Sequence, residues 1–351
     1  MTSLAVHGLD DWPAEVAGFL ATAAGRSFAT GIAYERALAT LPRAGSPRMF
    51  IARQEGRIVG ALPGRLEGRF GGRWFRSQPL GTPAGPCFDP TLAGQGVPAL
   101  AEVASALWRA VGETARREGW LGGDITLSGP AAAEGAEALR PPADVGAVRY
   151  DEAHVIDLSG GVEAWRPSLD KRARAMLRQA PARGVELGHG NGGEDLARVY
   201  ELFVDQTRAW GVKQVRPLSF YRALMAPPTD ARLWIGRLGG EIVCGVLGFV
   251  SPEETYVWWS GASPKARPVS AFPATLALLV EDCGSRRVNF GFSGHQSRLT
   301  DFKEQLGAAP LSVPVIELTP RPRSPWHALL VLGRAHMRTR AARRRTTKER
   351  A

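Results

Sequence analysis

The segment Asn289–Gly307, NFGFSGHQSRLTDFKEQLG, places a lysine beside an aromatic residue just beyond the end of a predicted strand. The strand should end before a turn at Ser293, and a helix then carries Phe302 and Lys303 and stops at Gly307. Strand ends of mixed α/β sheets commonly hold ligands. A cation and a ring held there can position a substrate and stabilise developing negative charge. The segment is therefore the first candidate for a functional site, with the turn residue Ser293 as a substrate contact.

Two further positions complete the set of candidates from local sequence. Asp301 is the carboxylate nearest to Lys303 and is the candidate general base. Farther upstream, residues 255–261 form a predicted strand in which alternation puts Tyr256 and Trp258 on one face and Trp259 on the other. One of these faces should line the core, and Trp259 is the candidate for an acceptor groove on the other face.

An internal repeat indicates how these residues are positioned. Residues 51–66, IARQEGRIVGALPGRL, align without a gap with residues 235–250, IGRLGGEIVCGVLGFV, and six of the sixteen positions are identical. Both segments predict a β-hairpin that bends at a glycine. A second pair follows in the same order, because DITLSG at 124–129 matches NFGFSG at 289–294 and each follows a helical pattern. Only the second copy is followed by an aromatic-lysine helix, which suggests one active copy and one supporting copy.

The order of elements predicts an α+β fold with two tandem domains, each a mixed sheet flanked by helices. We place the first domain at residues 1–150, the second and catalytic domain at 151–319, and a linker and tail at 320–351. The second half should begin after a strand at 155–158 and contain a basic helix at 163–180.

The net charge of +10 belongs to the tail and not to the folded body. Residues 321–351 hold ten Lys or Arg and one acidic residue, which leaves 34 basic and 33 acidic residues elsewhere. The tail predicts an arm that contacts tRNA phosphates or an anionic membrane surface, and a merely solubilising tail is the third interpretation. Its candidate contact residues are Arg338, Arg340, Arg343, Arg344 and Arg345.

The order hairpin, strand, helix, strand, helix resembles the GNAT acyltransferase fold. Two copies in tandem, the second ending in NFGFSG and DFKEQLG, resemble the Fem-type aminoacyltransferases. The words SLDKRARAMLRQAPARG at 168–184 and YELFVDQTRAWGVKQVRPLSFY at 200–221 belong to the same resemblance, which covers most of residues 150–318. It implies transfer of an aminoacyl group from a charged tRNA to an amine, on a peptidoglycan precursor or a small secondary-metabolite intermediate.

The resemblance also implies roles for three residues. Lys303 takes the place of a functionally important lysine near the reacting centre, and Phe302 that of a ring able to stack on the terminal adenosine of tRNA. Arg216 takes the place of an arginine that contacts a phosphate of the acceptor, and its planar fork suits phosphate or carboxylate.

Two alternatives remain open at this stage. Acyl-CoA domains usually hold a pyrophosphate on a glycine-rich loop, whereas the matching stretch 265–271, KARPVSA, has a proline and no glycine, which disfavours an acyl-CoA donor. The other alternative is a degenerate GNAT pair that binds RNA or membrane through its tail.

We expect no metal site and no bound cofactor, since the three cysteines are far apart and no ligand cluster appears. The absence of a signal peptide at residues 1–16 and of a membrane-length apolar run predicts a cytoplasmic protein.

Overall fold

The fold is described from a computed structural model in which residues 4–42, 44–69, 72–77, 82–127, 139–209, 215–293 and 297–319 are placed well enough to describe. The chain forms two compact units, and each contains a piece of chain from beyond the linear boundary near residue 150. Residues 31–42 belong to the second unit, and residues 314–319 belong to the first. Two long strands, β7 (Gly146–Asp157) and β13 (Ala309–Leu318), each contribute residues to both units.

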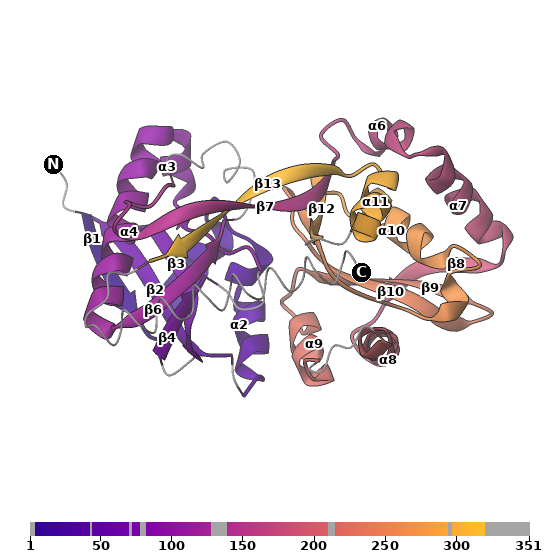
Figure 1. The fold of residues 1–351 in the computed structure, drawn as a ribbon, viewed down its shortest axis with the longest axis horizontal. Coiled ribbons are helices and arrows are strands. Elements are labelled where there is room, and N and C mark those ends of the chain that lie inside the picture. The colour runs from indigo at the N-terminus through magenta and orange to yellow at the C-terminus, as the bar shows by residue number, and fades with distance from the viewer. Residues whose placement is uncertain are drawn as a thin grey trace, which may run out of the picture. The chain divides into compact units, whose positions relative to one another are not determined.

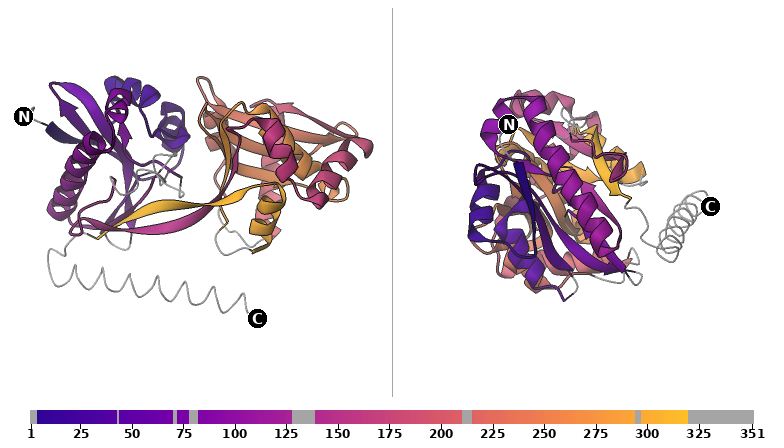
Figure 2. Two further views of the ribbon diagram at one scale, coloured as in Figure 1. Left: turned by 90° about the horizontal axis from the view of Figure 1, so that it is seen from above. Right: turned by 90° about the vertical axis from the view of Figure 1, so that its left-hand side faces the viewer.

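The first unit is a sheet in the order β1-β2-β3-β4-β6, and the last residues of β13 continue it beyond β6. The 22-residue helix α4 packs its buried Val103, Leu107 and Val111 against the sheet residues Phe50 and Ile125. The right-hand view of Figure 2 shows this long helix lying across the sheet. The spacing of three and four residues between its apolar positions explains why one stripe is buried. The elements are β1 (Leu4–Leu9), α1 (Ala14–Thr22), a 3-10 turn (Phe28–Thr30), β2 (Ser46–Gln54), β3 (Arg57–Arg69), β4 (Gly72–Arg76), β5 (Cys87–Phe88), α3 (Pro90–Gly94), α4 (Val97–Glu118) and β6 (Trp120–Thr126).

The second unit is a sheet in the order β7-β12-β11-β10-β9-β8, in which only β11 and β12 are parallel neighbours. Figure 1 shows α8 and α9 on one face of this sheet and α7, α10 and α11 on the other. Close approach on both faces follows from small residues, since a Cβ at Gly245 would meet Val199 of α8 and one at Gly236 would meet Thr275 of α10. The elements are α2 (Ile32–Ala39), α6 (Val162–Trp165), α7 (Lys171–Ala182), β8 (Val185–Gly190), α8 (Glu194–Ala209), α9 (Leu218–Met225), β9 (Ala231–Leu238), β10 (Glu241–Val250), β11 (Thr255–Ala262), α10 (Ala271–Asp282), β12 (Arg287–Phe292) and α11 (Ser297–Gln305).

The predicted repeat is present as two matching hairpins. The turn residues Glu55 and Gly56 have φ of 51° and 81°, and Gly239 and Gly240 have φ of 57° and 79°. Positive φ at both central residues is the geometry of the tight turn that suits the strand twist of a hairpin. Both hairpins also carry a bulge at the same aligned place. The extra residue is Val59 in the first hairpin and Val243 in the second, and these two residues are equivalent in the repeat. The sequence repeat is therefore a repeat of backbone geometry.

The basic helix expected at 163–180 is broken in two, and this prediction was wrong. A short helix, α6, and a 3-10 turn at Arg166–Ser168 end at Leu169. A new helix, α7, then begins with Asp170 as its N-cap, whose carboxylate accepts a hydrogen bond from the Ala173 amide at 2.5 Å. The proline at 167 and an aspartate in the capping position explain the interruption.

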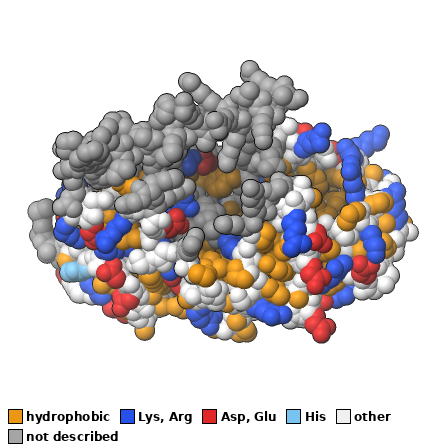
Figure 3. Space-filling view, turned by 60° about the horizontal axis from the view of Figure 1, so that its bottom comes forward, with side chains coloured by type: hydrophobic (Ala, Val, Ile, Leu, Met, Phe, Trp, Pro, Cys, Tyr) orange, Lys and Arg blue, Asp and Glu red, His pale blue; other side chains and the backbone are white. Residues whose placement is uncertain are grey.

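Charges of both signs are mixed on the surface of the described residues. On the face drawn in Figure 3, acidic and basic side chains lie among one another. Ion pairs such as Lys265–Glu241 at 2.6 Å and Arg237–Asp195 at 2.7 Å link neighbouring elements. This agrees with the near balance of 34 basic and 33 acidic residues outside the tail.

Candidate active site

Lys303 lies inside the second unit and not on its surface. It is 5% exposed and is the one buried side chain assigned to α11. Its ammonium donates a hydrogen bond to the Gly291 carbonyl on β12 at 2.8 Å. Burial lowers the pKa of Lys303 to about 8. Among the described residues no carboxylate forms an ion pair with it, so the charge is held by a neutral carbonyl alone.

The strand end beside Lys303 differs between the two copies of the repeat. The alignment of DITLSG with NFGFSG makes Thr126 of β6 equivalent to Gly291 of β12. In the first unit, the Thr126 carbonyl accepts a hydrogen bond from the Ala84 amide at 2.9 Å, so the chain's own loop occupies the edge of the strand. In the second unit, the pairing of β11 with β12 ends at Asn289, and two residues farther along β12 the Gly291 carbonyl accepts the hydrogen bond from Lys303. The Lys303 ammonium therefore donates to the Gly291 carbonyl where, in the first unit, a backbone amide of the loop donates to the equivalent carbonyl of Thr126.

The helix that carries Lys303 is held in place by its C-terminal glycine and by the packing of Phe302. Gly307 has φ of 82° and ends the helix, and a Cβ at this position would collide with the Ser168 hydroxyl. Phe302 is half-buried and stacks on Phe272 of α10, with ring centroids 5.9 Å apart. Asp301 is exposed on the same helix. Lys303 and Phe302 therefore point into the unit, while Asp301 faces solvent.

Ser293 lies two residues beyond Gly291 and is 4% exposed. Its hydroxyl is 3.5 Å from Nδ1 of His154, a fully buried histidine on β7. The other ring nitrogen, Nε2, has no hydrogen-bond partner among the described residues. It faces the carboxylates of Glu304 at 3.8 Å and Glu152 at 3.9 Å. His154 was not a candidate from sequence, because its partner Ser293 is 139 residues away and only the pairing of β7 with β12 brings the two together.

Arg216 and Trp259 lie in an aromatic cluster beside α8, α9 and β11. The Arg216 guanidinium is 5.8 Å from the ring centroids of both Phe220 and Trp258, a cation–π distance. Its backbone carbonyl accepts a hydrogen bond from the Tyr200 hydroxyl at 2.8 Å. The side chain is half-buried, so the rings fix the direction of the guanidinium while part of it stays accessible.

The two tryptophans of β11 do not occupy opposite faces as alternation predicted. The register of β11 against β10 shifts at Leu247 and Gly248, so Trp258 is an extra residue in a bulge. As a result, Trp258 and Trp259 both contact the ring of Tyr221, at 6.0 and 4.8 Å between centroids. Trp259 is buried, and its indole nitrogen has no hydrogen-bond partner within the described chain. A bulge inserts one residue and thereby breaks strict alternation.

The loop that precedes α10 offers few amides to a phosphate. It contains a 3-10 turn at Pro264–Ala266, and the carbonyl of Pro268 accepts a hydrogen bond from Arg183. Ser270, the N-cap, has φ of 57°, and its hydroxyl caps no amide. Pro273 removes a further amide from the first turn of the helix. Because backbone amides at a helix start are what bind a pyrophosphate, this end of α10 is a poor pyrophosphate site.

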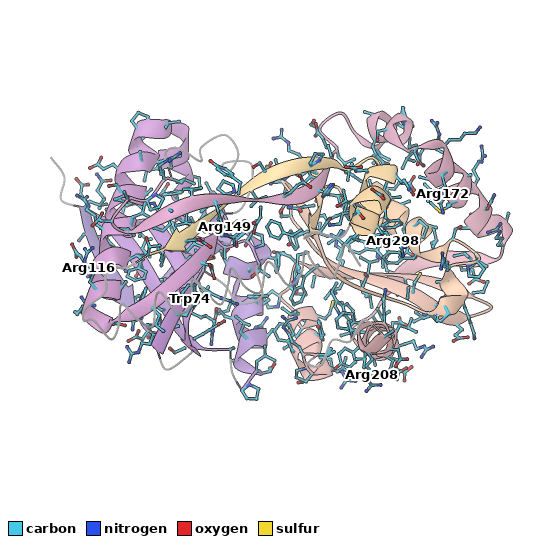
Figure 4. The ribbon with its side chains drawn as sticks, in the orientation of Figure 1. Trp74, Arg116, Arg149, Arg172, Arg208 and Arg298 are labelled. Atoms are coloured by element: carbon cyan, nitrogen blue, oxygen red, sulfur yellow. The ribbon has the colours of Figure 1, made fainter. Side chains whose placement is uncertain are left out.

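Figure 4 shows Arg298 on α11 and Arg172 on α7, on the face of the second unit's sheet opposite to Arg208 of α8.

Within the described residues no group of three or more His, Cys, Asp or Glu side chains is arranged to hold a metal ion. No helix in the described ranges is both long and apolar enough to span a membrane. The five tail arginines predicted to contact tRNA or an anionic surface lie outside the described residues.

Comparison with known proteins supports the assignment of the fold. Residues 168–299 match the family model of the acetyltransferase (GNAT) domain, a match that ends just before Lys303. The sequence matches no curated protein. The crystal structure of FemX is similar, with a TM-score of 0.63, 12% sequence identity and coverage of 88% of this chain and 96% of FemX.

A second similar structure is that of L-PGS from Bacillus licheniformis, with a TM-score of 0.52 and 13% identity over 92% of this chain and 95% of L-PGS. At these identities the likeness concerns the fold alone. The chain therefore has the α+β fold of FemX and L-PGS with a GNAT-type domain in its second half, and the predicted resemblance to the Fem-type tandem GNAT proteins is confirmed at the level of the fold.

Proposed function

We propose that this chain is an acyltransferase that forms an amide bond, taking an aminoacyl group from aminoacyl-tRNA and passing it to an amine. The GNAT domain match and the fold shared with FemX and L-PGS support the general class of acyl transfer. The observation that carries the proposal is the buried Lys303 ammonium at the end of β12, which binds a backbone carbonyl and forms no ion pair within the described residues.

An uncompensated buried charge is costly, and such groups concentrate at functional sites. In aminolysis of an ester, negative charge develops on the carbonyl oxygen, and a cation already in place stabilises it without reorganisation. Because Lys303 has a pKa of about 8, it carries its charge near neutral pH. We assign to it the role of stabilising this oxyanion.

The donor is the second part of the proposal. The loop before α10 lacks the run of amides that holds the pyrophosphate of acyl-CoA, which favours an acyl donor bound in another way. Phe302 stacks with Phe272 on one side. We assign its remaining side to the terminal adenosine of tRNA, since stacking on an aromatic ring contributes about 1–3 kcal/mol per base.

For the acceptor, we propose an amine on a peptidoglycan precursor or on a small secondary-metabolite intermediate. Arg216 is held on two aromatic rings and is half-buried, which suits recognition of one anionic group on that acceptor. Trp259 would act through the same cluster by orienting the ring of Tyr221, on which it stacks. Asp301, the general base predicted from sequence, stays a prediction.

The donor experiment tests the proposal most directly. Purified full-length protein is incubated with the small-molecule amine fraction of a cell extract and either total tRNA charged with labelled amino acids or labelled acetyl-CoA. We expect label to pass from tRNA to an RNase-resistant product and RNase added at the start to abolish the transfer. Transfer from acetyl-CoA alone would instead support an N-acetyltransferase, the alternative that the GNAT domain match favours.

Lys303→Met is the informative variant in the same assay, because it keeps the length of the side chain and removes the charge. It should lower kcat by about 100-fold or more, the usual effect of losing one oxyanion-stabilising group. Lys265→Met is the matched control, since Lys265 is exposed and pairs with Glu241. Transfer from neither donor would refute the proposed function and leave a binding role for the chain.

A further inference from the structure

His154 is the least explained polar group of the second unit. It is fully buried on β7, and among the described residues its one polar neighbour within hydrogen-bond range is the Ser293 hydroxyl, at 3.5 Å from Nδ1. Nε2 lacks a hydrogen bond among the described residues. A buried polar atom without a partner destabilises a folded protein, and an apolar side chain on β7 would avoid that cost. The position is therefore hard to explain by folding alone.

The two nitrogens of the His154 ring face different surroundings. On the Nδ1 side, Ser293 is buried at the end of β12, two residues from the carbonyl that Lys303 binds. On the Nε2 side lie Glu304 of α11 and Glu152 of β7, with side chains 51% and 63% exposed. Both carboxylates lie within 4 Å of Nε2. The imidazole thus connects a buried hydroxyl beside the candidate site to carboxylates in contact with water.

We propose that Ser293 and His154 remove the proton that the acceptor amine must lose during amide bond formation. This inference rests on the proposed function. As the amine nitrogen attacks the acyl carbon, its proton passes to Oγ of Ser293, while the Ser293 hydroxyl proton passes to Nδ1 of His154. The C–N bond forms, the bond from the acyl carbon to the donor oxygen breaks, and the proton on the resulting imidazolium returns to the leaving oxygen or to water.

The arrangement supplies what each step of this transfer needs. A hydroxyl between amine and imidazole can donate and accept at once. The imidazole can accept a proton at Nδ1, and the carboxylates of Glu152 and Glu304, within 4 Å of Nε2, stabilise the resulting imidazolium by their charge. Lys303 and Glu304 are consecutive on α11, so one helix turn provides the cation for the oxyanion and a carboxylate for the base. In this scheme Ser293 touches the reacting atoms, and His154 acts through it.

The test compares Ser293→Ala and His154→Gln with the wild-type full chain. With aminoacyl-tRNA as donor, we expect kcat near neutral pH to fall by about 100-fold or more in each variant, the usual contribution of a positioned base, with KM values little changed. The defect should shrink at high pH, because hydroxide can then take the proton that the attacking nitrogen loses as the C–N bond forms. Arg298→Ala, exposed on the same helix, is the control and should keep wild-type rates at every pH.

A further variant tests the carboxylate side of the ring. Glu304→Gln should lower kcat because the imidazolium formed during transfer loses a facing carboxylate, and an unchanged kcat in this variant would overturn the proposed path. If His154→Gln fails to fold, as circular dichroism would show, Ser293→Ala decides the kinetic test.

The outcomes separate this inference from the proposed function. Absence of transfer by the wild-type protein would refute the function itself. Transfer by the wild type with Ser293→Ala within about threefold of its rate, far below the effect of a lost base, would refute only the proton path. A defect that stays constant across pH would mark Ser293 and His154 as structural and would also overturn it.

Discussion

Replacing Lys303 by methionine should make the protein more stable at neutral pH while it removes activity. The folded-state pKa of Lys303 is lowered from 10.5 to about 8 by burial. At about 1.4 kcal/mol per pKa unit, holding this ammonium in its charged form destabilises the folded state by about 3 kcal/mol. The hydrogen bond to Gly291 that methionine cannot make offsets about 1 kcal/mol of this, so a net gain of about 2 kcal/mol is expected.

The sign of the pH dependence follows from which state binds the proton more tightly. Below about pH 8 both the folded and the unfolded chain carry the proton, and the full cost of the buried charge is present. Between about pH 8 and 10.5 the folded chain loses the proton while the unfolded chain keeps it, so the stability of the wild type rises with pH. The advantage of Lys303→Met over the wild type should therefore shrink across this window and vanish or reverse at its upper end.

Urea unfolding of wild type and variant near pH 7 and near pH 10 measures this effect. Other groups titrate equally in both proteins. The stability difference between variant and wild type, compared between the two pH values, therefore reports on Lys303 alone. In the control Lys265→Met, an exposed ion pair with Glu241 is lost, and the stability change should stay below ~1 kcal/mol at both pH values. The reasoning is refuted if Lys303→Met is less stable than the wild type near neutral pH, or if the difference does not depend on pH.

Three further predictions concern other parts of the chain. Tyr34→Ala should lower the free energy of unfolding by about 3–5 kcal/mol, because the buried ring packs on Phe220 and Trp258, whereas the exposed Tyr150→Ala should change little on urea unfolding. Gly307→Ala should destabilise far more than Gly240→Ala, since both have positive φ but only the first Cβ meets a side chain, and thermal unfolding compares them. Deleting residues 321–351 should raise the apparent KM for tRNA and weaken its dependence on salt, and unchanged kinetics would refute a role of the tail in binding tRNA.

Much of the fold was predictable because local patterns carry it. The glycine at the hairpin bends and the apolar runs on either side predicted two matching hairpins, one in each repeat. The helix that carries Lys303 was predicted within one residue of its observed end. The break before α7 was missed, since a proline and an N-cap aspartate within a basic run were outweighed by the helical periodicity around them.

The sites were predictable to a smaller extent. The candidate status of Lys303 came from its neighbours in sequence and from the resemblance to Fem-type enzymes. The burial of Lys303 could not be predicted in this way, because nothing in the local sequence distinguishes it from a solvated lysine on a helix surface. Alternation failed at Trp258 because a bulge is set by the register with the neighbouring strand, a property of two segments and not of one.

The sequence by itself determined the repeat, the order of elements, the separation of charge between body and tail, and the helix that holds Phe302 and Lys303. These features depend on contacts between residues close in the chain or on composition. Only the tertiary structure decided that the Lys303 ammonium binds the Gly291 carbonyl and that His154 faces Ser293. Both contacts join different elements, and the second spans 139 residues, so they exist only once β12 pairs with β7 and α11 closes over its end.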